Sequence, residues 1–198
     1  MHAAGGVEQA AGEGAPAPLA ANPSNHRDCL QVLIDANANI EVTNDVDRTP
    51  LSWVARRGNT ECLRVLMEAR ANIHARDVHG YTALSHATVE GSTDCARLLV
   101  AARADIDAKD IHLLGDTVAP LLYAVVSNHV DLLRFLIESN ADLETRATSG
   151  YTPLMTASRK GFTQCAELLI NARANVDAPG YGETALMIAV CQDDATCT

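Results

Sequence analysis

Apolar residues recur along this chain at helical spacing, in short segments separated by polar turns. Leu63 and Leu66 lie three positions apart, and Leu132, Leu133 and Leu136 repeat that spacing. This spacing gives a helix one apolar face. The pattern predicts helices at about 60–69, 93–102, 130–139 and 163–172.

A recurring tetrapeptide marks the start of a second set of helices. Its clear copies are Thr49-Pro50-Leu51-Ser52, Thr82-Ala83-Leu84-Ser85, Thr152-Pro153-Leu154-Met155 and Thr184-Ala185-Leu186-Met187, and Ala119-Pro120-Leu121-Leu122 is a weaker copy. A threonine hydroxyl caps a helix N-terminus, and a proline at the first helical position loses no hydrogen bond. The predicted helices cover about 50–57, 83–90, 120–127, 153–160 and 185–192. Four of them are followed by a residue suited to a left-handed helix end, namely Gly58, Gly91, Asn128 and Gly161.

These signals repeat with a common period. The tetrapeptide returns at steps of 33, 37, 33 and 32 residues. The segment that begins with Cys29-Leu30 steps by 33, 33, 37 and 33, and Ala38-Asn39-Ile40 recurs in the same phase. The chain is therefore an array of helix-turn-helix units with a four-residue insertion between the second and third full repeats. Such a unit buries its apolar face only against its neighbours.

The period, the tetrapeptide and the Ala-x-Ala-Asn-Ile segment resemble the ankyrin repeat over about 24–192. The resemblance implies an all-α fold, an ankyrin-repeat solenoid of stacked helix-turn-helix units with hairpin-like loops. Ala/Gly-rich residues 1–15 predict a disordered tail, and 193–198 form a C-terminal tail. The repeat domain at 16–192 divides into a degenerate unit at 16–45 with Pro18 near its first helix start, full repeats at about 46–78, 79–115, 116–148 and 149–180, and a half repeat at 181–192.

Two repeat positions depart from the family's pattern. The family's loop-tying histidine at the end of the tetrapeptide is replaced by Ser52, Ser85, Leu122, Met155 and Met187. The glycine usual after the second helix is replaced by Asn37, Arg70, Arg103, Asn140 and Arg173. A left-handed arginine costs roughly 1 kcal/mol. The array therefore either carries strain at three arginines or ends these helices with a different geometry.

Six cysteines raise the alternatives of a disulfide framework or a metal ladder. Cys29, Cys62, Cys95 and Cys165 share one repeat position, and packed helices lie about 8–10 Å apart. A disulfide needs Cα atoms within about 7 Å. We therefore expect small buried side chains, and reduced thiols are typical of a cytoplasmic or nuclear protein.

Charge and motifs argue against several functions. The formal net charge of −10 disfavours nucleic acid and anionic membranes as partners. No apolar run reaches the roughly 18 residues of a membrane span. The chain has no HExxH, GxxxxGK[ST] or GxSxG motif, and its histidines lack metal-ligand spacing. Catalysis needs a water-excluding pocket, whereas a short ankyrin-type stack offers an open groove. We therefore expect a protein that is not an enzyme and that uses no cofactor or metal.

The resemblance implies that a partner contacts the loop tips and the inner helix face. Register assigns the partner-binding role to Arg48, Arg56, Arg57, His79, Tyr81, Glu90, Tyr151, Arg159, Lys160 and Tyr181. Exposed tyrosine and arginine are typical anchors, and basic residues on an acidic chain favour an acidic and apolar partner segment. The alternative is that these are ordinary solvated loop tips.

Two functions remain open from the sequence. The first is a monomeric scaffold that binds a partner protein through its concave groove and loop tips. The second is a regulatory or targeting segment of a larger enzyme, ubiquitin-ligase adaptor or channel. The insertion near 111–118 carries the apolar run Ile111-His112-Leu113-Leu114 in a loop. That run either covers the neighbouring unit or contacts a partner.

Overall fold

The computed structural model describes residues 23–111 and 117–191. Both predicted tails, the helix start at Pro18 and the apolar run after Ile111 lie outside these residues. Within them the chain forms short α-helices and one small β-ladder. The elements are α1 (Pro23–Asp35), α2 (Pro50–Arg56), α3 (Thr60–Glu68), α4 (Ala83–Val89), α5 (Thr93–Ala101), β1 (Asp110–Ile111), β2 (Thr117–Val118), α6 (Pro120–Val126), α7 (Val130–Glu138), α8 (Pro153–Lys160), α9 (Thr163–Asn171) and α10 (Ala185–Cys191).

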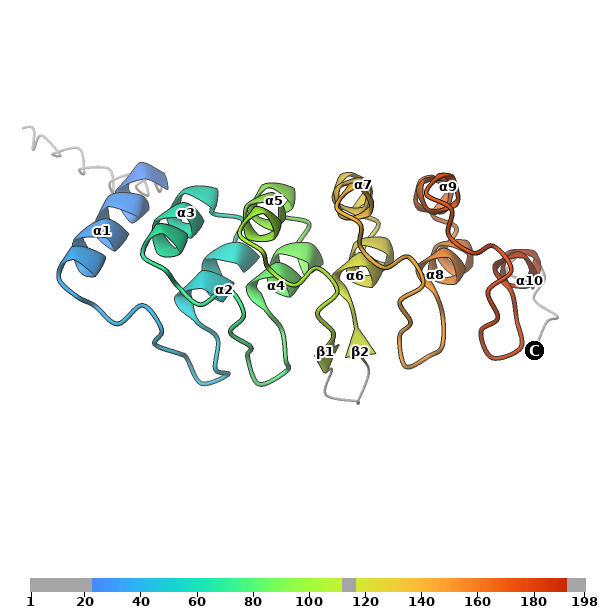
Figure 1. The fold of residues 1–198 in the computed structure, drawn as a ribbon, viewed down its shortest axis with the longest axis horizontal. Helices are drawn as coiled ribbons and strands as arrows, with labels where there is room; N and C mark the ends of the chain where they lie inside the picture. The colour runs from blue at the N-terminus through green and yellow to red at the C-terminus, as the bar shows by residue number, and fades with distance from the viewer. Residues whose placement is uncertain (1–22, 112–116, 192–198) are drawn as a thin grey trace, which may run out of the picture.

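The helices stack in two parallel rows, which confirms the predicted all-α solenoid (Figure 1). The inner row contains α2, α4, α6, α8 and α10, each packed against the next. The outer row contains α1, α3, α5, α7 and α9, which also pack in sequence. A loop finger precedes each inner helix and projects from the inner row (Figure 1). In the finger that carries the insertion, β1 and β2 pair antiparallel, with Asp110 opposite Val118.

The tetrapeptide begins the inner helices as predicted. The Thr49 hydroxyl accepts from the Ser52 backbone N–H, and Thr82 and Thr152 cap α4 and α8 in the same way. Ala119 cannot cap by its side chain, and α6 instead has only proline at its first position. The helix starts match the prediction to the residue, whereas most ends fall one residue earlier because the final residue is a C-cap.

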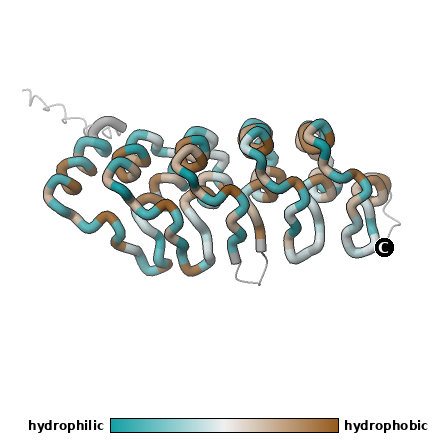
Figure 2. Tube along the Cα trace, in the orientation of Figure 1, coloured by the Kyte–Doolittle hydropathy of each residue, from teal (hydrophilic) through white to brown (hydrophobic). Residues whose placement is uncertain are grey.

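The core lies between and along the two rows. Leu63, Leu99, Leu133 and Leu169 of the outer helices are fully buried. Ala87, Ala124 and Ala157 are also fully buried at one inner-helix position. Small side chains there let neighbouring helices approach closely. Figure 2 shows apolar positions recurring at each helix pair along the stack.

The cysteine prediction holds at three of four positions. Cys62, Cys95 and Cys165 are buried and free, and burial raises the pKa of the Cys95 thiol to about 11. Cys29 contradicts the prediction because it is exposed. It lies on α1, the first outer helix of the described stack, so no preceding helix packs over it. The buried thiols are therefore packing residues.

The three arginines at the usual glycine position adopt the left-handed backbone. Their φ angles are 66° at Arg70, 72° at Arg103 and 70° at Arg173, while Asn37 and Asn140 have 60° and 62°. The first of the two predicted alternatives is therefore correct: the helix ends keep the family's geometry. Each arginine carries a strain of roughly 1 kcal/mol relative to glycine.

Carboxylates at another repeat position tie successive loops together. Glu41 accepts from the Asn72 backbone N–H at 2.8 Å, Asp107 from Asp142 at 2.9 Å and Glu144 from Asn175 at 2.7 Å. These three carboxylates share one repeat position. The same position holds His74 and Asp177, for which no such bond occurs among the described residues. Hydrogen bonds from backbone N–H groups to charged side chains thus link several pairs of successive loops.

Candidate partner-binding surface

The ten candidate residues lie on loop fingers and inner helices across four units, not in one cluster. Arg48, Arg56 and Arg57 flank α2 near the first described end of the stack. Tyr151, Arg159, Lys160 and Tyr181 flank α8 and the following finger. His79, Tyr81 and Glu90 lie around α4, between these two groups.

Arg48 serves the fold as much as the surface. Its side chain is 11% exposed, and its Nη2 donates to Asp77 Oδ2 at 3.4 Å. His86 Nε2 lies 2.9 Å from the same carboxylate oxygen. The other Asp77 oxygen accepts from the His79 and Tyr81 backbone N–H groups. Arg48 and α4 are thus joined through one buried carboxylate.

His86 is the packing residue that its register predicts, and it also forms a polar tie. It is 5% exposed and hydrogen-bonded to Asp77. Burial lowers the pKa of His86, and the nearby Arg48 charge lowers it further. The lowered pKa favours the neutral ring, whose Nε2 also accepts from Arg48 Nε at 3.1 Å. The sequence signal for the hydrogen bond to Asp77 was that His86 directly follows the fourth residue of the tetrapeptide, where the family usually has histidine.

Tyr81 is half-buried within a stack of rings. Its ring lies 5.2 Å from His86 at an interplanar angle of 27°, and 5.8 Å from Tyr123. The His79 ring meets Tyr81 edge-on at 6.3 Å. Both candidate residues are therefore partly engaged inside the molecule, which the register alone did not predict.

A buried carboxyl group lies next to this ring stack. Asp110 is fully buried at the start of β1, and Ser85 Oγ donates to its Oδ1 at 2.7 Å. Its Oδ2 has no partner among the described residues. Burial raises the Asp110 pKa to about 7, and the Ser85 hydrogen bond opposes that shift. Burial also raises the pKa of Tyr123.

The group around α8 presents its cations and rings more openly. Arg159 lies over the half-buried Tyr151 ring at 4.9 Å from its centroid. Lys160 is exposed at the end of the same helix. Tyr181 is 77% exposed, although its hydroxyl donates to the Thr148 carbonyl at 2.9 Å. These side chains match the predicted anchor chemistry.

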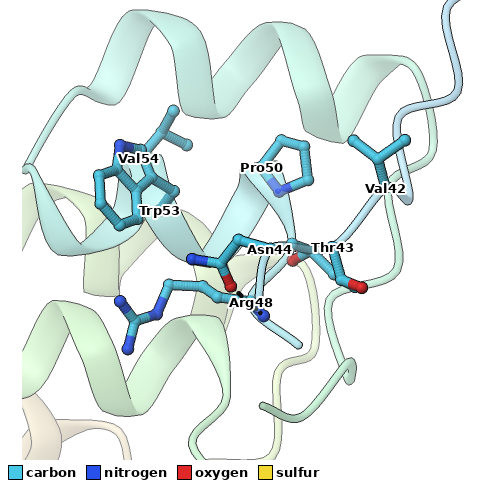
Figure 3. Close-up of a pocket in the computed structure, with 8 residues that line it drawn as sticks. Val42, Thr43, Asn44, Arg48, Pro50, Trp53 and Val54 are labelled. Carbon is cyan, nitrogen blue, oxygen red and sulfur yellow. Dashed lines mark hydrogen bonds between the residues drawn. The ribbon is translucent and has the colours of Figure 1, made fainter. Parts of the chain in front are cut away.

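The group around α2 includes residues that the sequence reasoning missed. Arg56 pairs with Glu90 at 3.0 Å, with both side chains exposed. Arg57 lies over the Trp53 ring at 5.3 Å. Trp53 is 42% exposed and borders a pocket with Val42 and Pro50 (Figure 3). The available signal was a tryptophan at a position filled by half-buried or buried residues in the later units.

Two negative findings apply to the described residues. No group of three or more His, Cys, Asp or Glu residues within 23–111 and 117–191 is arranged to hold a metal ion. In the same ranges, every helix is too short or too polar to cross a membrane.

Comparison with known proteins gives one family and several partial relatives. A family model for ankyrin repeats (3 copies) matches residues 19–110 and 121–198. The probable E3 ubiquitin-protein ligase XBOS33 of Oryza sativa subsp. japonica is 36% identical over 77 residues, which are 38% of this chain and 15% of the ligase. The E3 ubiquitin-protein ligase XBAT33 of Arabidopsis thaliana is 34% identical over 85 residues, 42% of this chain and 17% of that protein. The chain thus spans under a fifth of the length of these relatives.

A solved structure supports the fold. The ankyrin repeat domain of Bcl-3, a unique member of the IkappaB protein family, aligns with a TM-score of 0.77 and 24% identity. The alignment covers 84% of this chain and 74% of that chain. At this identity the likeness concerns the fold alone.

Proposed function

Because the chain belongs to the ankyrin repeat family, whose repeats are generally protein-interaction domains, we propose that it is a non-catalytic scaffold for a partner protein. The partner contacts the loop fingers and the adjoining ends of the inner helices. The observation that carries the proposal is the set of exposed cations and rings on two separate units, with Arg57 on the α2 side and Arg159 and Lys160 on the α8 side. The protein acts as a monomer in the cytoplasm or nucleus.

Charge supports an acidic and apolar partner segment. The chain carries a net charge of −10, yet Arg57, Arg159 and Lys160 have no carboxylate within ion-pair distance in the described part of the chain. Such cations attract carboxylates of a partner at a modest desolvation cost. Arg48, His79 and Tyr81 are partly occupied by internal contacts, so they contribute less than the register suggested.

The binding proposal is tested by affinity capture from cell extract with the wild-type chain beside an Arg57→Ala/Tyr151→Ala/Arg159→Ala variant. We expect the variant to lose specific partners while its melting temperature stays close to that of the wild type. An Arg64→Ala/Arg134→Ala variant, changed on exposed positions of outer helices, serves as the matched control. Equal recovery of the same proteins by all three chains would show that the surface is wrongly assigned.

A second candidate function is a regulatory or targeting segment of a larger enzyme, ubiquitin-ligase adaptor or channel. It is supported by the two plant relatives, both E3 ubiquitin-protein ligases matched over only 15% and 17% of their length. Sequencing the full-length transcript separates the candidates. A transcript that encodes no further domain removes the second one.

A further inference from the structure

A pocket lies beside α2, the first inner helix of the described residues. It is bounded by Val42, Thr43 and Asn44 of the first finger and by Pro50, Trp53 and Val54 of the helix (Figure 3). Its volume is about 480 Å³. This is enough for a bulky side chain and its flanking backbone. No inner helix precedes α2 among residues 23–111 and 117–191.

The pocket wall is apolar and carries no carboxylate. Val42 is 54% exposed and Trp53 is 42% exposed. The eight lining residues include one charged side chain, Arg48, on a chain with 25 acidic and 15 basic residues. The Arg48 charge is compensated by Asp77. Burying this wall against an apolar side chain of a partner therefore stabilises the complex.

On the Trp53 side of the pocket lies a cation without an ion-pair partner in the described chain, Arg57, which contacts the Trp53 ring but does not itself line the pocket. The guanidinium of Arg57 lies 5.3 Å from the centre of the Trp53 ring, and that of Arg48 lies 5.7 Å from it. Arg57 is exposed and has no ion-pair partner among the described residues. A guanidinium over a tryptophan ring still has N–H groups to offer to a carboxylate. This side of the pocket therefore favours a negative charge next to the apolar side chain.

We propose that this pocket is the anchor site for a partner's linear segment, in which a bulky apolar side chain enters against Trp53 and an adjacent carboxylate pairs with Arg57. The proposal rests on the scaffold function above and gives the partner segment its chemistry and its place. The first finger continues past Asn44 to Asp45 and Asp47. The acidic residues of the partner must therefore lie on the α2 side of the pocket, away from the finger tip.

The test uses a phage-displayed library of random twelve-residue peptides panned against the full chain. We expect enriched peptides with one large apolar residue and acidic residues on one side of it. A resynthesised, fluorescein-labelled peptide should bind Trp53→Ala or Val42→Asp at least tenfold more weakly, by fluorescence polarisation. Arg57→Glu should lose about as much, whereas Arg57→Lys should retain most of the affinity because it keeps the charge.

Matched controls decide between this site and the rest of the surface. Arg64→Ala and Arg134→Ala, on exposed positions of the outer helices, should leave the affinity unchanged. Full binding by Trp53→Ala together with loss in Tyr151→Ala and Arg159→Glu would overturn the anchor site but leave the scaffold function standing. A basic consensus, or no enriched peptide, would also overturn it. Tighter binding by Leu19→Asp would support the pocket as the peptide's site and would show that the chain's own N-terminal residues compete for it.

Discussion

The buried carboxyl group of Asp110 makes folding stability depend on pH. Its pKa of about 7 in the folded chain lies above the usual value of 3.8, so the folded state holds an extra proton between these limits. Stability is therefore lost as pH rises through the folded-state pKa. In Asp110→Asn the amide oxygen keeps the Ser85 hydrogen bond without the charge. The variant should gain on the wild type by about 3 kcal/mol between pH 5 and pH 8.

Urea unfolding of both chains at pH 5 and pH 8 measures this gain. His86 titrates in the opposite sense, because its lowered folded-state pKa costs stability as pH falls. Both chains carry His86, so the difference between them removes its effect. A difference that stays constant with pH would mean that Asp110 is charged in the folded chain at pH 5.

The left-handed arginines predict a gain in stability on substitution. Arg70→Gly, Arg103→Gly and Arg173→Gly each relieve a residue with φ near 70°. Each should stabilise the chain by about 1 kcal/mol, because glycine enters this region freely. Arg64→Gly is the matched control, since Arg64 is exposed within α3 and should lose about 1 kcal/mol there. Guanidinium unfolding midpoints measure both, and a loss at the three left-handed sites would refute the strain.

These residues show where sequence-based prediction ends. The positions of the strained arginines follow from register, because the preceding helix end is a local feature. The burial of Asp110 and the stacking of Tyr81 do not, because they depend on side chains from α4 and α6 meeting at one loop base. The Trp53 pocket was missed for a related reason: it forms where side chains of the first finger and of α2 meet.

At the scale of elements, side-chain-to-backbone hydrogen bonds link successive loop fingers at one repeat position, with a gap at His74. Glu41, Asp107 and Glu144 each accept a backbone N–H from the next finger, whereas His74 occupies the same position without such a bond. His74→Glu should supply an acceptor for the Asp105 backbone N–H. A gain of about 1 kcal/mol is expected for a bond of this kind.

Thermal and urea unfolding measure the stability that His74→Glu adds. Glu144→Ala is the complementary variant and should lose a similar free energy of unfolding, because it removes a hydrogen bond that exists. The carboxylate introduced by His74→Glu would bond to the backbone N–H of an acidic residue, Asp105. The existing bond from the Asp142 backbone N–H to the Asp107 carboxylate shows that the array tolerates this arrangement. If both variants destabilise the chain, the loop that carries His74 is placed differently from the equivalent loops, and the expected bond does not form.

Across the whole molecule, stability should be highest in the middle of the stack and lowest at its described ends. In a repeat array each unit is stabilised mainly by its two neighbours. α4 to α7 have packed neighbours on both sides in both rows. α10 packs on α8 but has no outer helix of its own in the described chain, and its Leu186 and Val190 are 74% and 63% exposed. Local unfolding should therefore begin there.

Hydrogen–deuterium exchange with mass spectrometry measures this gradient. Peptides from α10 should exchange orders of magnitude faster than those from α5 and α6, because opening α10 exposes little additional apolar surface. Leu186→Lys changes a side chain that is already exposed, so it should leave the protection of α6 unaltered. Ile188→Ala, which removes a side chain that is 4% exposed, should speed exchange in α10 and α8 but not in α4. Uniform protection along the chain would show instead that the array unfolds as one cooperative unit, and the gradient would then be wrong.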